Sequence, residues 1–361
     1  MKKNLVLGIM SGTSIDSVDY ALCEIDGQGI RLRALWSARF PKAMQTALHA
    51  AARGDLASYP LAQLHHDLGR FYARHAQSPR RPDFIALHGQ TIFHNPAPEN
   101  PATLQLGEPA YLVEALRAPV ISNFRAADMA AGGQGAPLAT LFHQFVFAQR
   151  GEHVCVNNLG GISNVTSLHG RKIIAFDTGP ANVLIDMMMR HLTKGRLSMD
   201  RGGKWAACGK PSAMLLEKWL EHGYFTQPPP KSTGRELFGE PFFHNVLRET
   251  QKLSRFDKIA TLTEFTARSL ALNYRLHLAS LPDKIILTGG GAANPALVGR
   301  ISAQFPGAQV VTSEALGWPV QSIEPAAFAL LGWMRMNGRP GNLPQTTGAR
   351  RAALLGQVSR Y

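Results

Sequence analysis

The sequence predicts an α/β protein built from two duplicated lobes around a central cleft, and three glycine-marked turns carry this prediction. Each turn follows a short strand-like run: residues 8–16 follow Leu5-Val6-Leu7, residues 158–164 follow Val154-Cys155-Val156, and residues 288–291 follow Ile285-Ile286-Leu287. Glycine lets the backbone approach a ligand closely and turn its N–H groups toward anionic oxygens. Three such turns indicate a nucleotide held between two lobes.

The duplication is visible in the order of the elements. Residues 4–26 are typical of a β-hairpin with a glycine turn, and residues 153–168 repeat that design. Helical periodicity predicts helices over 61–76, 111–116, 257–281 and 325–337. Asn294 and Pro295 are typical of a helix start. Because residues 132–137 resemble a domain junction, we expect a first lobe over 1–130, joined by the tail 338–361, and a second lobe over 131–337.

Composition excludes several classes of protein. The 361 residues suffice for two domains, and no apolar run reaches the roughly 20 residues of a membrane span. The apolar N-terminal run is short and is followed by acidic residues, so we expect a first strand rather than a signal peptide, and a cytoplasmic protein without membrane partners. The three cysteines form no CxxC pair, which argues against a disulfide framework or a zinc site.

The net charge of +13 is typical of a protein that binds nucleic acid. The basic residues are scattered along the chain, however, and no nucleic-acid-binding motif occurs. We therefore expect no nucleic-acid partner. A basic surface of this kind favours anionic small substrates.

Asp177 is the candidate for chemistry. A strand expected to end at Asp177, followed by a helix opening at Pro180, would place this carboxylate where open α/β sheets bind ligands. Such a carboxylate can take a proton from a hydroxyl or water. The alternative is an aspartate that only caps the following helix.

Asp16 is the candidate for metal binding, since magnesium joins one or two carboxylates to phosphate oxygens. The alternative is an aspartate that bonds its own hairpin backbone. No GxxxxGK[ST] motif occurs, so this is not a P-loop protein.

Together these segments resemble the anhydro-N-acetylmuramic acid kinase family, within the superfamily of sugar kinases, actin and heat-shock ATPases. The resemblance covers essentially the whole chain. It rests on ordered blocks at 12–19, 88–92, 105–107, 123–125, 132–138, 159–164, 176–180, 229–236 and 288–291. It implies ribonuclease H-like (actin-like ATPase) domains. It also implies ATP and Mg²⁺ as cofactors, and a homodimer acting on a small amino sugar.

The resemblance further implies a mechanism. Water deprotonated by Asp177 would open 1,6-anhydro-N-acetylmuramic acid, and the freed O6 would take the γ-phosphate of ATP. The implied sugar contacts are His88, Gln90, Arg125 and Glu324, with Arg125 on the lactyl carboxylate. The implied nucleotide contacts are Gly12, Thr13, Ser14, Ile15, Asp16, Ser17, Val18, Asp19, Gly160, Gly161, Asn164, Gly289, Gly290 and Gly291, with Asp16 also holding the metal.

The chain departs from the family pattern at two positions. Ser17 stands where the family usually has glycine, and a positive φ there would cost roughly 1 kcal/mol. Ala181 replaces another common glycine, at a helix start, where we expect no effect. Two other functions compete: a sugar kinase acting on a free hydroxyl, which would also need Asp177, and a nucleotide-switched binding protein of the actin type. The binding protein would need a separate peptide-binding domain, which we do not expect after the third glycine turn.

Overall fold

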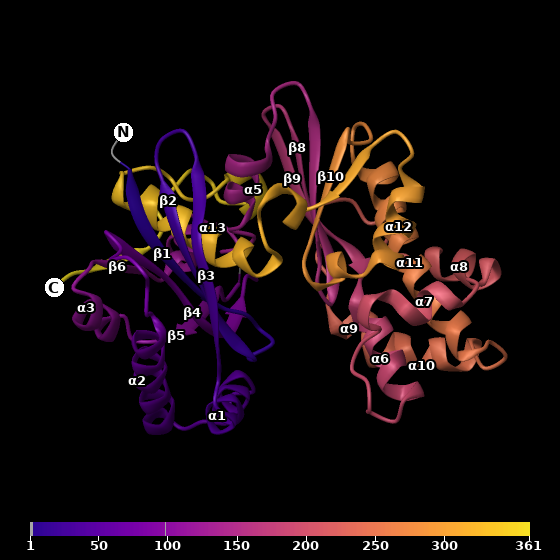
Figure 1. The fold of residues 1–361 in the computed structure, drawn as a ribbon, viewed down its shortest axis with the longest axis horizontal. Helices are drawn as coiled ribbons and strands as arrows, with labels where there is room; N and C mark the ends of the chain where they lie inside the picture. Colours follow the sequence, from indigo (N-terminus) through magenta and orange to yellow (C-terminus); the bar gives the residue numbers. More distant parts are fainter. Residues whose placement is uncertain (1–2, 98) are drawn as a thin grey trace. The chain divides into compact units, whose positions relative to one another are not determined.

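The computed structural model describes residues 3–97 and 99–361, and the chain divides into two compact units. Unit 1 comprises Met1–Val146 and Gln321–Tyr361, and unit 2 is the continuous segment Phe147–Val320. Each unit holds one β-sheet covered by helices, which can be followed in Figure 1.

Unit 1 contains the strands β1 (Asn4–Ser11), β2 (Ser17–Ile25), β3 (Ile30–Arg39), β4 (Phe84–Asn95), β5 (Ala102–Leu106), β6 (Val120–Ser122) and β12 (Gln357–Ser359). Its helices are α1 (Lys42–Ala52), α2 (Ser58–His75), α3 (Ala110–Leu116), α4 (Phe124–Ala130), α5 (Thr140–Phe147), α13 (Ile323–Met336) and α14 (Pro344–Thr347). The short 3₁₀ turn η4 (Val320–Ser322) leads into α13.

Unit 2 contains the strands β7 (His153–Leu159), β8 (Ile162–His169), β9 (Lys172–Pro180), β10 (Lys284–Thr288) and β11 (Gln309–Thr312). Its helices are α6 (Asn182–Leu192), α7 (Lys204–Cys208), α8 (Ala213–Leu220), α9 (Arg235–Phe238), α10 (Glu240–Glu249), α11 (Arg255–His277) and α12 (Pro295–Gln304). Short 3₁₀ turns are η1 (Arg201–Gly203), η2 (Gly290–Ala293) and η3 (Glu314–Leu316).

The two sheets share one topology, which confirms the predicted duplication. In unit 1 the spatial order is β12-β6-β4-β1-β2-β3, with β5 on β4, and in unit 2 it is β11-β10-β7-β8-β9. In both, the first three strands form an antiparallel meander. The fourth strand of the motif then pairs in parallel with the first. This arrangement is the ribonuclease H-like α/β fold.

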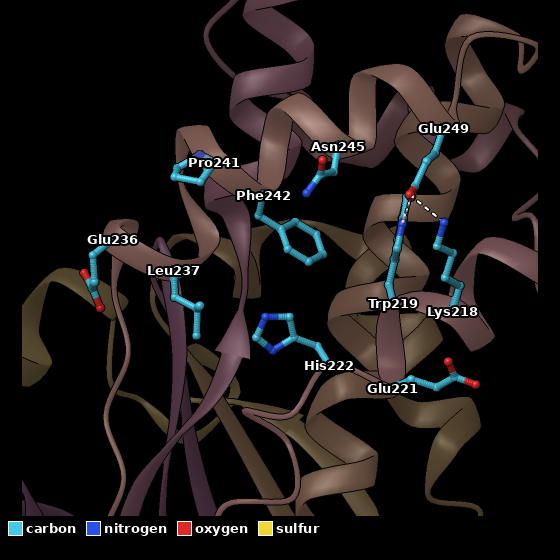
Figure 2. A pocket seen from close by; sticks show the side chains of 10 residues that line it. All are labelled: Lys218, Trp219, Glu221, His222, Glu236, Leu237, Pro241, Phe242, Asn245 and Glu249. Carbon is cyan, nitrogen blue, oxygen red and sulfur yellow. Dashed lines mark hydrogen bonds and ion pairs between the residues drawn. The ribbon is translucent and has the colours of Figure 1, made fainter.

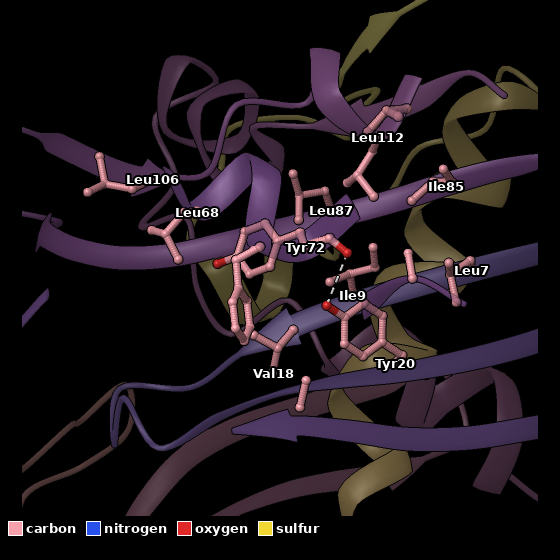
Figure 3. Close-up of a cluster of buried hydrophobic side chains, with 14 of the residues drawn as sticks. Leu7, Ile9, Val18, Tyr20, Leu68, Tyr72, Ile85, Leu87, Leu106 and Leu112 are labelled. Carbon is pink, nitrogen blue, oxygen red and sulfur yellow. Dashed lines mark hydrogen bonds between the residues drawn. The ribbon is translucent and has the colours of Figure 1, made fainter. Parts of the chain in front are cut away.

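The core of unit 1 explains why its first strands are apolar on both faces. Leu7 and Ile9 of β1 are fully buried and pack with Tyr20 of β2 and Tyr72 of α2 (Figure 3). The Tyr20 hydroxyl donates to the Tyr72 backbone oxygen at 3.2 Å. Strands covered on both faces read as continuous apolar runs, which is the pattern of β1.

Helix α13 packs directly on β1, β2 and β4 of unit 1. Two glycines make this close approach possible. A Cβ at Gly8 would lie 1.8 Å from the Pro325 backbone oxygen, and one at Gly332 would lie 2.8 Å from the Ala86 Cβ. Gly8, which the sequence places at the start of the first turn, therefore lies inside a strand and is needed for packing.

The boundaries between the units differ from those expected at 130 and 337. They fall at 146/147 and 320/321, because α13 buries its apolar face on the unit 1 sheet. The expected junction at 132–137 lies within unit 1. There the Gly135 N–H donates to Asp128 Oδ2 at 2.8 Å, and the Gln134 N–H donates to the Thr347 oxygen at 2.8 Å. These bonds tie the glycine-rich segment to α4 and to the C-terminal segment.

The expected helices are confirmed with small shifts in their ends, and so is the predicted helix start at Asn294. Its side chain accepts from the Leu297 N–H at 3.1 Å, and Pro295 is the first residue of α12. Among the helices that the structure describes, none combines the length and apolar composition of a membrane crossing.

Candidate active site

Asp177 lies in β9 of unit 2, next to a bulge in the β8–β9 pair. The register shifts between Ser163 and Asn164, so Asn164 faces Asp177 and Ser163 faces Gly179. Gly179 has φ of +120°, a backbone conformation that favours glycine. Because this bulge absorbs the extra residue, β9 continues to Pro180 and α6 begins only at Asn182. The expected strand end at Asp177 and helix start at Pro180 were wrong.

Three hydrogen bonds from one neighbouring segment and one tyrosine hold Asp177. The Thr233 N–H donates to its Oδ2 at 2.9 Å, and its own N–H donates to the Lys231 oxygen at 3.1 Å. The Tyr224 hydroxyl donates to the Asp177 backbone oxygen at 2.8 Å. Backbone and carboxylate are thus both oriented.

The surroundings of Asp177 raise the pKa of its carboxyl group to about 6. Burial is the largest cause, since it penalises the charged form, and the nearby negative charge of Glu236 adds to it. The Thr233 N–H bond acts in the opposite direction. A carboxylate with a pKa near neutrality is suited to accept a proton and to release it again.

The second glycine turn lies at the end of the β7–β8 pair, next to Asp177. Asn164 is directly opposite Asp177 across the antiparallel pair, so their side chains share one face of the sheet. The Asn182 side-chain amide donates to the Leu159 and Gly160 oxygens, at 2.8 Å each. A Cβ at Gly160 or Gly161 would meet no atom closer than 3.5 Å. Packing therefore does not require glycine at these two positions.

The third turn adjoins the second because β10 pairs in parallel with β7. Gly289 has φ of +79°, and a Cβ there would lie 2.3 Å from the Asn158 Oδ1. A Cβ at Gly291 would lie 2.7 Å from the Leu159 Cβ, whereas one at Gly290 would meet nothing within 4 Å. Unit 2 therefore brings Asp177, Asn164 and both predicted turns together, with open space at Gly290 and no close contact at Gly160 or Gly161.

The first turn joins β1 to β2 in unit 1 and carries Gly12, Thr13, Ser14, Ile15 and Asp16. The Gly12 oxygen accepts from the Ile15 N–H at 3.2 Å and from Gln90 Nε2 at 3.1 Å. Thr13, Ser14 and Asp16 are exposed. Ile15 and Val18, by contrast, point their side chains into the unit 1 core, so only their backbone could face a ligand.

Ser17 does not have the positive φ that would have made serine costly there. Ser17 begins β2 in extended conformation, and the positive φ of this turn, +58°, falls on Ile15. Asp19, expected among the nucleotide contacts, also lies in β2, where it accepts a hydrogen bond from the Ser37 hydroxyl.

His88, Arg125 and Glu324 form a second group in unit 1. Arg125 donates to His88 Nε2 from Nε at 3.2 Å and from Nη2 at 3.0 Å, and from Nη1 to the Gly135 oxygen at 2.7 Å. Burial and the charge of Arg125 hold the pKa of His88 well below its usual range. His88 is thus neutral, with Nε2 as acceptor and its proton on Nδ1.

The charge of Arg125 also acts on Glu324. Burial raises the pKa of Glu324, attraction by Arg125 lowers it, and repulsion by Asp19 raises it. The carboxyl group is thus closely surrounded by protein, while Glu324 as a residue still reaches solvent. Gln90 is fully buried, and its Oε1 has no hydrogen-bond partner among the residues that the structure describes. Unit 1 therefore gathers the four predicted sugar-binding residues around β4 and the start of α13.

A separate pocket of about 460 Å³ lies between α8, α9 and α10 of unit 2 (Figure 2). Trp219, His222 and Phe242 form its wall, and Glu249 accepts from Trp219 Nε1 at 2.6 Å and pairs with Lys218 at 2.8 Å. None of the residues predicted to act in catalysis or in binding lines this pocket. Glu236 does, and it is the residue whose charge reaches Asp177.

Sequence reasoning missed the residues that hold Asp177 in place. Tyr224, Lys231 and Thr233 contact it directly, although they lie far from it in the chain. The only available signal was the block at 229–236, in which Lys231 and Thr233 lie. No local pattern connects that block to β9, because the contact is made only by the fold.

Two ribonuclease H-like units, open glycine turns and a carboxylate of raised pKa place the chain in the class of two-unit kinases and ATPases. The family model for anhydro-N-acetylmuramic acid kinase matches residues 4–360. The chain belongs to this family, and with it to the enzymes that transfer phosphate to sugars.

Two relatives at about 40% identity bear this out. An anhydro-N-acetylmuramic acid kinase from a Cyanothece species is 39% identical, over 99% of this chain and 99% of its own. One from Crocosphaera subtropica is 41% identical, over 98% of each chain. Among solved structures, the activator of 2-hydroxyisocaproyl-CoA dehydratase from Clostridium difficile with bound ADPNP has a TM-score of 0.47 and 9% identity, over 92% of this chain and 96% of that chain.

Proposed function

We propose that this kinase hydrolytically opens 1,6-anhydro-N-acetylmuramic acid and phosphorylates O6, giving N-acetylmuramic acid 6-phosphate and ADP in peptidoglycan recycling. Family membership supports the substrate and ATP as the phosphate donor. The observation that carries the chemistry is Asp177, a carboxylate with a pKa raised to about 6 and one oxygen already held by a backbone N–H.

Asp177 serves as the general base. Its Oδ2 accepts from Thr233, and Oδ1 has no hydrogen-bond partner among the described residues, so Oδ1 is the oxygen available to water. Water gives its proton to Oδ1 while its oxygen bonds to the anomeric carbon. The bond from that carbon to O6 breaks, and the electron pair stays on O6. O6 then bonds to the γ-phosphorus, and ADP leaves.

The glycine turns suit the phosphates of ATP. The absence of close neighbours at Gly12, Gly160, Gly161 and Gly290 leaves space in which backbone N–H groups can meet phosphate oxygens. Thr13, Ser14 and Asn164 add side-chain donors, and Gly289, Gly290 and Gly291 lie on the adenosine side. The remaining work of the protein in such a reaction is positioning and charge stabilisation.

Mg²⁺ would rely mainly on phosphate and water oxygens. Asp16 is exposed and supplies one carboxylate. Within 3–97 and 99–361, no group of three or more His, Cys, Asp or Glu side chains could hold a metal. A single carboxylate with phosphate ligands fits the usual coordination of magnesium at nucleotide sites.

Arg125 binds the lactyl carboxylate of the sugar, and Glu324, Gln90 and His88 bind its hydroxyl or amide groups. Arg125 has no carboxylate hydrogen-bonded to it among the described residues. Glu324 attracts it without a hydrogen bond, so guanidinium N–H groups remain for an anionic substrate. The unpartnered Gln90 Oε1 can accept a hydrogen bond. The enzyme acts in the cytoplasm as a homodimer and needs neither a membrane nor nucleic acid.

The test uses ATP, Mg²⁺ and 1,6-anhydro-N-acetylmuramic acid in ¹⁸O-labelled water, with mass spectrometry of the product. A phosphorylated sugar with ¹⁸O at the anomeric carbon supports coupled opening and phosphorylation. A product phosphorylated without ¹⁸O would favour the sugar kinase that acts on a free hydroxyl. Slow ADP release without a sugar product would favour the nucleotide-switched binding protein.

Asp177→Asn tests the base. We expect turnover to fall by about 10³-fold or more, with ATP binding retained, because the amide cannot accept the proton but can still accept from Thr233. Asp186→Asn is the matched control, since Asp186 in α6 also has a pKa raised to about 6 by burial. Comparable losses in both variants, or near-normal turnover in Asp177→Asn, would contradict the assignment.

A further inference from the structure

The Lys231 ammonium group makes an unusual set of contacts in unit 2. Nζ lies 3.2 Å from the Tyr224 oxygen, 3.1 Å from the Phe225 oxygen and 3.1 Å from His277 Nε2. It also lies 4.7 Å from the centre of the Tyr224 ring. No carboxylate pairs with it in the part of the chain that the structure describes. Two N–H donors of the charged lysine thus meet carbonyl oxygens, and His277 Nε2 contacts both Nζ and, at 2.9 Å, the Phe225 oxygen.

These contacts close a ring that passes through Asp177. The Lys231 side chain holds the backbone of Tyr224, whose hydroxyl donates to the Asp177 oxygen. The Lys231 backbone oxygen accepts from the Asp177 N–H, and two residues later the Thr233 N–H donates to the Asp177 carboxylate. Lys231 thereby anchors both segments that contact Asp177.

We infer that Lys231 is a positioning residue that fixes the Asp177 carboxylate through this ring of hydrogen bonds. The inference rests on the proposed role of Asp177 as the base. Lys231 itself needs no contact with either substrate. Displacing a catalytic group by about 1 Å can cost 10²-fold in rate, which is the effect a loosened ring would have.

The environment of Lys231 also makes the ring dependent on pH. Burial lowers the pKa of Lys231 to about 8. The groups that face it are His277 from α11, Tyr224 and the Phe176 ring of β9, and Asp177 through the backbone. Burial lowers the pKa of His277, the Phe225 oxygen raises it and the charge of Lys231 lowers it, and His277 Nε2 also lies 2.9 Å from that Phe225 oxygen. Above pH 8 the amine loses its charge and one N–H donor, which weakens its bonds to the Tyr224 and Phe225 oxygens, so the ring loosens.

Lys231→Met removes the charge and keeps the length of the side chain. We expect its kcat to fall by about 10- to 100-fold, while KM for ATP changes by less than about threefold. Lys252→Met, at an exposed lysine of the same unit, is the matched control and should behave like the wild type. An unchanged kcat in Lys231→Met would overturn the inference. So would a loss that appears only as a raised KM.

Tyr224→Phe opens the same ring from the other side, because it removes only the hydroxyl that donates to Asp177. We expect Lys231→Met combined with Tyr224→Phe to be little worse than Lys231→Met alone. Losses that multiply would show two independent effects and would contradict a shared ring. The kcat of the wild type should also decline as pH rises through about 8, and this decline should vanish in Lys231→Met. If the decline in kcat persists in Lys231→Met, a titrating group other than Lys231 causes it.

Hydrogen exchange separates this inference from the proposed function, since it needs no turnover. Peptides that contain the Asp177 and Thr233 amides should exchange about tenfold faster or more in Lys231→Met than in Lys252→Met, with the rest of unit 2 unchanged. Equal exchange would overturn the ring even if Asp177 is the base. Faster exchange in a protein that does not turn over the anhydro sugar would support the ring and contradict the proposed function.

Discussion

At the scale of the residue, the burial that prepares Asp177 for chemistry also costs folding free energy. Its pKa is about 6 in the folded state against 3.8 in the unfolded chain, so folding favours the protonated form. The resulting stabilisation is present below pH 3.8 and is lost as pH rises through 6. Above pH 6 the folded protein holds a charged carboxylate that it solvates poorly.

We therefore expect Asp177→Asn to be more stable than the wild type at pH 7.5, by about 1–3 kcal/mol. The difference in free energy of unfolding between the variant and the wild type should be smaller at pH 4.5, where Asp177 is protonated in the folded state. Urea unfolding at both pH values, followed by tryptophan fluorescence, measures it. If the stability difference is equal at both pH values, the charge of the carboxylate is not its cause.

Ser17 gives the second prediction at this scale. Because Ser17 has an extended backbone and the positive φ lies at Ile15, glycine at 17 relieves no strain. We expect Ser17→Gly to lower the free energy of unfolding by about 0.5–1 kcal/mol through greater freedom of the unfolded chain, with turnover close to that of the wild type. A gain in stability would mean that Ser17 is strained after all, and a large loss of turnover would show that its hydroxyl has a role of its own.

At the scale of the element, the contact between α13 and the unit 1 sheet depends on Gly8. Since a Cβ there would lie 1.8 Å from the Pro325 oxygen, backbone must move to admit it. We expect Gly8→Ala to lower the free energy of unfolding by about 1–3 kcal/mol. It should also lower affinity for the sugar, because α13 carries Glu324.

Gly299 provides the matched control in a helix. A Cβ at Gly299 in α12 would meet nothing within 4 Å, so Gly299→Ala should stabilise the protein by about 0.4–1 kcal/mol. Thermal unfolding of the two alanine variants compares them directly. Shifts of the same sign would contradict the packing argument.

At the scale of the whole molecule, unit 2 is one continuous segment, whereas unit 1 is assembled from both ends of the chain. Unit 2 has its own sheet and its own buried clusters around α6, α11 and β10. We expect residues 147–320 to fold alone, because β7, β8, β9, β10 and β11 of that sheet all lie within the segment.

The isolated segment should show no turnover of the anhydro sugar, since Arg125 and Glu324 belong to unit 1. Circular dichroism during heating tests for cooperative unfolding, and a coupled ADP assay tests for activity. Full activity of the segment would contradict the sugar-binding assignments in unit 1. Failure to unfold cooperatively would show that unit 2 depends on the rest of the chain.

The duplicated hairpins and glycine turns could be predicted because each depends on neighbouring residues. Strand-like runs followed by glycine specify a turn locally, and the cap formed by Asn294 involves residues only three apart. The strand-like run before Asp177 already marked it as a candidate base, and the family block at 176–180 agreed with it. The boundaries between the units could not be predicted, because they depend on packing between distant residues. The sequence of α13 is that of an ordinary helix, and only its packing on β1 assigns it to unit 1.

The sequence by itself determined the α/β class, the duplication, the family and the carboxylate at which the chemistry is proposed. The tertiary structure alone decided how that carboxylate is held and what its pKa is. Lys231, Tyr224 and Thr233 reach Asp177 across 47 to 56 residues of chain. Burial, which sets the pKa, is a property of everything packed around the side chain and of no single position in the sequence.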